Sequence, residues 1–140
     1  MSQENVEIVR EMVAAAQRGD WQAAIAPFHQ AAELDVRRMP DGGTYHGADE
    51  VWSFFGRWFG HWDRLEITPR RIVDVDADRV LVVVELRGIG RSSGVEVAMT
   101  VADVYTLRQG KIVKDTGYPD YREALEALGL SEQDAREKSS

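Results

Sequence analysis

One acid on an apolar strand face is the strongest candidate for chemistry. The stretch from Val95 to Leu107 alternates as a β-strand does, so Asp103 and Tyr105 share a face with apolar residues such as Met99. Burial against such a face would raise the pKa of the Asp103 carboxyl, which suits a general acid or base. The alternative is a structural acid that pairs with an arginine or a backbone N–H, or a strand that faces the other way.

Two tyrosines and a second acid are further polar candidates. Tyr105 and Tyr118 could donate hydrogen bonds to an enolate-like oxygen, although strand tyrosines also serve as amphipathic packing. The second acid, Asp35, lies in a short strand. It alternates with Leu34, so a solvated position is the favoured interpretation, and Arg37 could pair with either Asp35 or Glu33.

The remaining candidates would line a pocket. His46 precedes a helix, where it could stand at a pocket mouth or be simply solvated. Aromatic residues could line an apolar cavity for a flat ligand, or they could fill the core. The three histidines are too dispersed for a metal site, so no metal and no other cofactor is expected. The candidate lining is Trp21, Asp35, His46, Trp52, Phe55, Phe59 and Met99.

Composition and charge narrow the class of protein. A length of 140 residues is typical of one domain, and 44% hydrophobic with 29% charged residues is ordinary globular composition. The net charge of −7 opposes binding to a phosphate backbone, so a nucleic-acid partner is not expected. Because there is no cysteine, disulfides and thiolate chemistry are excluded. No apolar run could span a bilayer and no secretory signal is present, which predicts a cytoplasmic protein without membrane contact.

Apolar spacing and turn residues predict helices first and strands afterwards. Asp20 is positioned to cap the second helix, and Arg108-Gln109-Gly110 indicates a tight hairpin. A loop is expected at 40–43. The predicted elements are helices at 3–18, 21–28 and 48–62, strands at 32–39, 65–75, 80–88, 95–107 and 111–118, and a terminal helix at 121–128.

This order of elements predicts an α+β fold. Three N-terminal helices would pack on a strongly curved, mostly antiparallel sheet, with the helices segregated onto one face. Residues 1–130 are predicted to form a single domain. The polar tail at 131–140 is expected to fray.

Several motifs together resemble a known family. They are G-D-W after the first helix, T-Y-H-G before the aromatic helix, T-L-R-Q-G-K-I at the hairpin, and Y-P-D at the end of the last strand. Over roughly residues 3–130 this pattern is similar to the SnoaL-like group of the nuclear transport factor 2-like superfamily. The resemblance implies a conical pocket between the sheet and the first three helices, with a polar pocket group near the position of Asp35. It also implies a homodimer through the outer sheet face. Members include polyketide cyclases, ketosteroid isomerases, dehydratases and epoxide hydrolases, and others only bind or assemble.

Two functional hypotheses remain. In the first, the protein binds a small apolar molecule and acts as a cofactor-free isomerase, cyclase or lyase on a polycyclic or polyketide-like compound. Asp103 would then move the proton, with Tyr105 or Tyr118 polarising an oxygen. In the second, the protein is a non-catalytic ligand-binding or dimerisation domain whose cone is filled by its own aromatic side chains.

Overall fold

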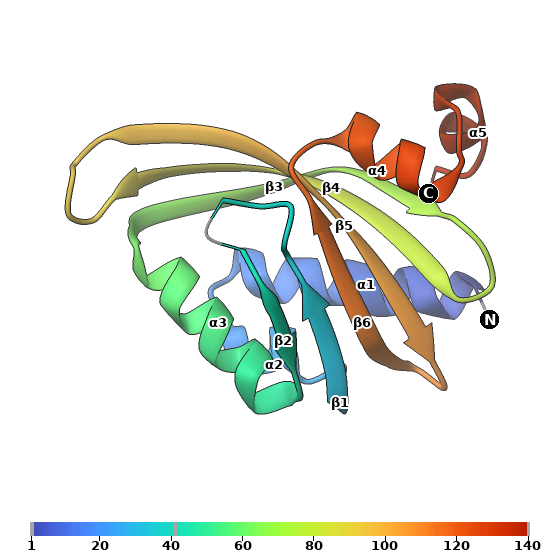
Figure 1. The fold of residues 1–140 in the computed structure, drawn as a ribbon, viewed down its shortest axis with the longest axis horizontal. Helices are drawn as coiled ribbons and strands as arrows, with labels where there is room; N and C mark the ends of the chain where they lie inside the picture. Colours follow the sequence, from blue (N-terminus) through green and yellow to red (C-terminus); the bar gives the residue numbers. More distant parts are fainter. Residues whose placement is uncertain (1, 41, 140) are drawn as a thin grey trace.

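The computed structural model describes residues 2–40 and 42–139, and its helices lie on both faces of one curved sheet (Figure 1). The predicted α+β class with a mostly antiparallel sheet is confirmed. Asp41, in the predicted loop at 40–43, lies outside the described residues. The elements in chain order are α1 (Ser2–Gln17), α2 (Trp21–Ile25), β1 (Phe28–Asp35), β2 (Thr44–His46), α3 (Ala48–Gly60), β3 (Trp62–Asp74), β4 (Arg79–Gly90), β5 (Glu96–Arg108), β6 (Lys111–Tyr118), α4 (Tyr121–Leu128) and α5 (Glu132–Glu137).

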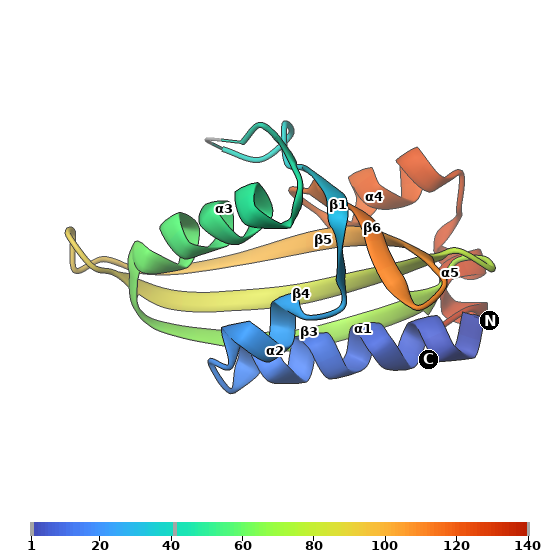
Figure 2. The same ribbon diagram turned by 90° about the horizontal axis from the view of Figure 1, so that it is seen from below.

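The sheet has six strands in the order β2-β1-β6-β5-β4-β3. β1 and β6 are parallel, and every other neighbouring pair is antiparallel. Gln109 and Gly110 both take positive φ in the two-residue turn between β5 and β6, as the hairpin pattern predicts. Strands β3, β4 and β5 run side by side over 12 or 13 residues each (Figure 2). They form the long curved wall on which the helices pack.

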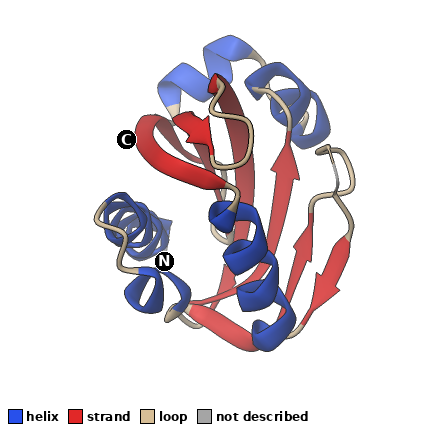
Figure 3. Cartoon of the chain, turned by 90° about the vertical axis from the view of Figure 1, so that its left-hand side faces the viewer, coloured by secondary structure: helices blue, strands red, loops and turns tan. Residues whose placement is uncertain are grey.

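Two apolar clusters lie on opposite faces of this wall. The larger cluster joins α1, α2 and α3 to the inner, concave face, and Leu34 and Leu107 are among its fully buried members. The smaller cluster joins α4 and α5 to the outer face, where Ala124 packs with Ala102. Helices therefore cover both faces (Figure 3), and the expectation of a single helical face is wrong. The outer face of β4 and β5 is itself apolar at this end, so it needs a cover of its own.

Strand β1 begins earlier than the sequence pattern indicates. Asp20 caps α2 as expected, because its Oδ1 accepts a hydrogen bond from the Ala23 N–H at 3.2 Å. The helix ends at Ile25, since Pro27 has no N–H with which to continue it. Phe28 instead pairs with β6, and the edge strand β2 extends the sheet on the far side of β1.

The polar tail, expected to fray, forms helix α5 against the outer face. Ser131 and Asp134 make a reciprocal capping box in which each side chain accepts from the other residue's backbone N–H at 3.0 Å. Ala135 is fully buried in the outer cluster. A capped helix with a buried small residue therefore outweighs the polar composition of this segment. Within the described residues, no helix is long and apolar enough to cross a membrane.

Replacing Ser131 with alanine is expected to lower the free energy of unfolding by about 1 kcal/mol, because one half of the capping box is lost. Chemical denaturation of wild type and variant measures this difference. Ser92→Ala, in the exposed turn between β4 and β5, is the matched control and should leave stability unchanged. Equal losses in the two variants would contradict a specific cap.

Candidate functional site

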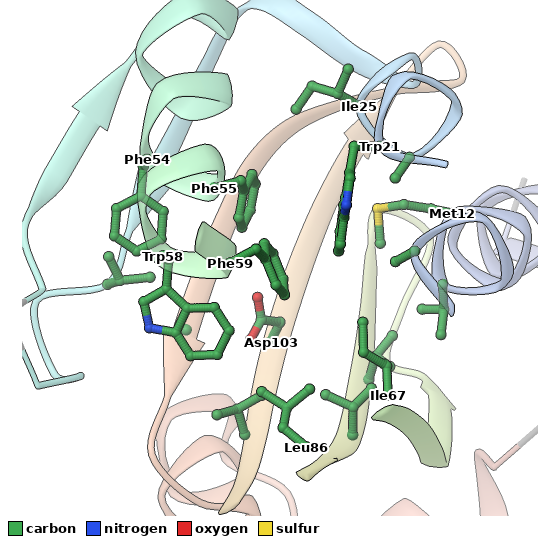
Figure 4. A pocket seen from close by; sticks show the side chains of 18 of the residues that line it. Met12, Trp21, Ile25, Phe54, Phe55, Trp58, Phe59, Ile67, Leu86 and Asp103 are labelled. Atoms are coloured by element: carbon green, nitrogen blue, oxygen red, sulfur yellow. The ribbon is translucent and has the colours of Figure 1, made fainter. Parts of the chain in front are cut away.

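A cavity of about 460 Å³ lies between the concave face of the sheet and the N-terminal helices (Figure 4). Its lining comes from α1, α2 and α3, from the start of β1 and the loop after it, and from the inner faces of β3 to β6. Most of the lining side chains are apolar. Trp52 lines the cavity yet is 45% exposed, so the cavity reaches the surface beside α3.

The aromatic wall of the cavity comes mainly from α3, which carries large rings at helical spacing. Phe55 and Phe59 lie one turn apart with ring centroids separated by 6.0 Å, and Trp58 meets Phe59 edge-on at 4.9 Å. Trp21 of α2 stacks on Phe59 from the other side at 4.2 Å. Figure 4 shows these rings around the space that Asp103 enters. Of the aromatic candidates, those that line the cavity are Trp21, Trp52, Phe55 and Phe59.

Asp103 and Tyr105 reach the cavity from the inner face of β5. The Tyr105 hydroxyl lies 3.5 Å from Oδ2 of Asp103, a long hydrogen bond in which the hydroxyl donates. Gly117 of β6 pairs with Asp103, and a Cβ at Gly117 would come within 3.7 Å of the Asp103 Oδ1. Among the described residues that line the cavity there is no lysine, arginine or histidine. The Asp103 carboxyl therefore has no cationic partner in the cavity wall.

A second carboxyl, Asp115 of β6, lies behind Asp103 and is absent from the candidates that the sequence suggested. It is fully buried between its strand neighbours Leu34 and Tyr105. Because Gly117 pairs with Asp103, Asp115 is the diagonal neighbour of Asp103 on the same face of the sheet. The two carboxyls lie close enough that each changes the pKa of the other. A hydrogen bond between them requires that one of them carries a proton.

Burial raises the pKa of all three polar groups. For Asp103 desolvation is the main cause, and hydrogen bonds from Asp115 and Tyr105 oppose the rise. For Asp115 burial raises the pKa well above its ordinary value, and the neighbouring Asp103 charge raises it further. Burial and both carboxyls raise the pKa of Tyr105 well above its ordinary value, so the hydroxyl remains a donor. The site thus combines a carboxyl that reaches the cavity, a hidden carboxyl and a hydroxyl donor.

Tyr118 lies on the opposite face of the sheet, which corrects its assignment as an oxyanion donor. It packs against the outer cluster, and its ring centroid is 5.6 Å from the guanidinium carbon of Arg38. The cause is a β-bulge in which Val113 is an extra residue, so the register between β5 and β6 shifts beside Ile112. The alternation inverts at that point, and Asp115 instead of Tyr118 shares a face with Ile112.

Three other lining candidates lie outside the cavity. Asp35 faces away from it, and Arg37 donates two hydrogen bonds to its carboxylate at 2.9 and 2.8 Å, which lowers the pKa of Asp35. His46 is exposed on the edge strand, with Nδ1 3.5 Å from Oε1 of Glu33. Met99 is half-buried on β5, nearer the start of the strand than the residues that line the cavity.

Comparisons with known proteins agree on the family. The model of the SnoaL-like domain matches residues 9–114. An NTF2-like protein from Burkholderia thailandensis E264 is 30% identical, with a TM-score of 0.73 over 88% of this chain and 95% of that chain. No curated protein sequence gives a match.

More distant solved structures share the fold. A protein described as a SnoaL-like polyketide cyclase from Jannaschia sp. CCS1 is 19% identical, with a TM-score of 0.74 over 92% of this chain and 94% of that chain. A protein with a ketosteroid isomerase-like fold from Catenulispora acidiphila DSM 44928, in complex with trimethylamine, is 19% identical, with a TM-score of 0.70 over 89% of this chain and 94% of that chain. Because the family model spans most of the sequence and a 30% identical protein shares the fold along nearly its whole length, this chain belongs to the SnoaL-like domain family, with an NTF2-like fold.

Proposed function

We propose that this protein binds an apolar polycyclic or polyketide-like molecule and acts on it as a cofactor-free isomerase, cyclase or lyase. The observation that carries the proposal is Asp103, the one carboxylate among the described residues that line an aromatic cavity of about 460 Å³. That volume falls within the range of small-molecule sites. A lining without lysine, arginine or histidine suits a neutral, apolar substrate better than an anionic one. The polyketide cyclase description of one similar structure supports the choice of class.

In this function the Asp103 carboxylate accepts a proton from a carbon next to a carbonyl group. The electron pair of the broken C–H bond moves onto the carbonyl oxygen and gives an enolate. Because Asp103 is then protonated, the Tyr105 hydroxyl turns from Asp103 and donates its hydrogen bond to the enolate oxygen. In an isomerisation Asp103 returns the proton to a second carbon. In a cyclisation the enolate carbon bonds to a second carbonyl carbon, and the new alkoxide takes the proton. Both outcomes conserve the atoms of the substrate and need no cofactor.

A panel of neutral polycyclic ketones in deuterated water tests the proposal. The expected result is protein-dependent deuterium uptake at the carbon next to the carbonyl, followed by NMR, with uptake saturating as the ketone concentration rises. The uptake should increase with pH, because only the ionised form of Asp103 accepts a proton and its pKa is raised by burial. Ketones that bind but take up no deuterium at any pH would count against catalysis.

A non-catalytic ligand-binding domain is the second candidate function. Aromatic rings beside one carboxylate also suit a small amine cation, and the Catenulispora acidiphila structure contains trimethylamine. Calorimetric titration with trimethylamine separates the two candidates when it is combined with the exchange assay. Binding of the amine without deuterium uptake on any ketone would favour this second function.

The homodimer through the outer sheet face remains a prediction. Helices α4 and α5 cover one end of that face, and the uncovered part carries Glu85 between Arg70 and Arg87, at 3.2 and 3.1 Å. A partner there would meet this ion-pair network. Size-exclusion chromatography with light scattering measures the oligomeric state.

A further inference from the structure

We propose that Asp115 is a positioning residue that carries the proton of a two-carboxyl pair at neutral pH and donates it in a hydrogen bond to Asp103. Asp103 is thereby held as the single anionic carboxyl of the site, in the orientation in which it enters the cavity. The part that Asp115 plays in the reaction rests on the proposed function. Its protonation state does not, and it can be measured without any substrate.

The surroundings of Asp115 favour a neutral acid. Both of its carboxyl oxygens are buried, and within the described residues no protein group donates a hydrogen bond to either one. An ionised carboxylate there would leave its lone pairs unsatisfied in a dry interior, which is strongly unfavourable. A protonated carboxyl needs only one acceptor for its proton, and Asp103 supplies that acceptor from the neighbouring strand.

Among the residues that the structure describes, no positive charge offsets an ionised Asp115. The titratable groups that face it are Asp103 and Tyr105 of β5, and both would repel its negative charge if ionised. β1 presents the apolar side chain of Leu34. Lys114, the nearest cation on the same strand, precedes Asp115 and therefore points to the opposite face of the sheet. There it forms an ion pair with Glu33 at 3.2 Å.

The two acids differ in a way that assigns the proton. Asp103 accepts a hydrogen bond from the Tyr105 hydroxyl and borders the cavity, where polar ligand atoms or water can solvate its charge. Asp115 lies outside the cavity lining, and no group in the described part of the chain donates a hydrogen bond to it. Burial and repulsion by Asp103 also raise the pKa of Asp115 well above its ordinary value, whereas hydrogen bonds to Asp103 oppose the rise in its own pKa. The anion therefore resides on Asp103.

The first test is the pH dependence of thermal unfolding in Asp115→Asn. An acid with a raised pKa in the folded protein binds its proton more tightly than in the unfolded chain, so wild-type stability falls as the pH rises above the ordinary value of 3.8. Asparagine keeps an N–H donor for Asp103 and has no proton to lose. The midpoint of unfolding of Asp115→Asn, relative to wild type, is expected to rise by about 5 °C or more between about pH 4 and pH 8.

Asp35→Asn is the matched control, because its pH dependence lies in a different range. The pKa of Asp35 is lowered by its hydrogen bonds from Arg37, so the stability that it contributes is already present above its ordinary pKa of 3.8 and is lost only at lower pH. The midpoint of Asp35→Asn relative to wild type should therefore stay nearly level between about pH 4 and pH 8. A flat or falling difference for Asp115→Asn would overturn the proposal, as would isotopically labelled aspartate NMR showing an ionised Asp115 at neutral pH.

The second test concerns the positioning role and uses the deuterium-uptake assay. Asp115→Asn keeps the donor and should retain most of the exchange rate. Asp115→Leu removes the donor while filling a site that already borders Leu34, so the pH profile should shift to higher pH and the rate near neutral pH should fall about tenfold or more. A profile in Asp115→Leu identical to wild type would overturn the positioning role. If wild type exchanges nothing, the proposed function fails, while the unfolding test still decides the protonation state.

Discussion

Replacing Asp103 with asparagine is expected to slow deuterium uptake on a ketone substrate by about 10²- to 10⁴-fold, the usual contribution of a general base. The amide has nearly the same shape as the carboxylate, but it cannot accept the substrate proton. The amide oxygen can still accept the hydrogen bond that we propose for Asp115, so the fold should persist. NMR measurement of the exchange rate, with thermal unfolding of the same sample, separates lost chemistry from lost structure.

Asp35→Asn is the control for this experiment, because Asp35 lies outside the cavity and is bonded to Arg37. Its exchange rate should equal that of wild type at temperatures where both proteins are folded. Binding of a neutral polycyclic dye should be retained in Asp103→Asn, since the aromatic wall is unchanged. A wild-type exchange rate in Asp103→Asn would show that the acid on β5 is not the base.

Much of the fold could be predicted because its determinants are local. Helix periodicity, the Asp20 cap, the Gln109-Gly110 turn and the alternation of β5 each depend on residues close together in the chain. The strand β2 and the helix α5 were not predicted for the opposite reason. β2 exists because β1 offers it an edge, and α5 because the outer face of the sheet buries Ala135. Contacts between distant segments override local composition in both cases.

In the candidate site, too, the features set by local sequence could be predicted and those set by contacts between strands could not. Alternation along β5 is regular from Val101 to Leu107, so Asp103 and Tyr105 could be assigned to one face from sequence alone. On β6 the bulge at Val113 inverts the alternation, so counting outward from Ile112 selects Tyr118 and passes over Asp115. A bulge depends on the partner strand, so the strand's own residues do not reveal it. The one available indication is Gly117, since a strand glycine often marks close approach by a neighbouring group.

The same bulge gives the site its second acid. Without the extra residue at Val113, Asp115 would share the outer face with residues such as Thr106, and Asp103 would stand alone in an apolar wall. A solitary buried carboxylate without a cationic partner tends to take up a proton and lose its basicity. A neighbouring neutral acid that donates a hydrogen bond opposes this tendency without adding a positive charge. The irregularity in β6 is therefore a structural requirement of the proposed chemistry.

Filling the cavity with Val84→Trp is expected to weaken binding of a neutral polycyclic dye such as Nile red by about 100-fold, equivalent to about 2.7 kcal/mol. Val84 is half-buried on β4 and lines the cavity, so a larger side chain there enters existing space. For this reason the free energy of unfolding should change by no more than about 1 kcal/mol, less than in a fully packed core. Fluorescence titration and chemical denaturation of one preparation measure both quantities.

Thr100→Trp is the matched control, since it adds an indole to an exposed position on β5 and Thr100 faces away from the cavity. Dye affinity in this control should match that of wild type. A cone already filled by its own aromatic side chains, as the non-catalytic hypothesis holds, makes a different prediction. In that case Val84→Trp would destabilise the fold by roughly 1–3 kcal/mol through overpacking, and wild type and Thr100→Trp would bind the dye no better than the variant. The pair of measurements therefore decides whether the space above Asp103 is a binding site or part of the core.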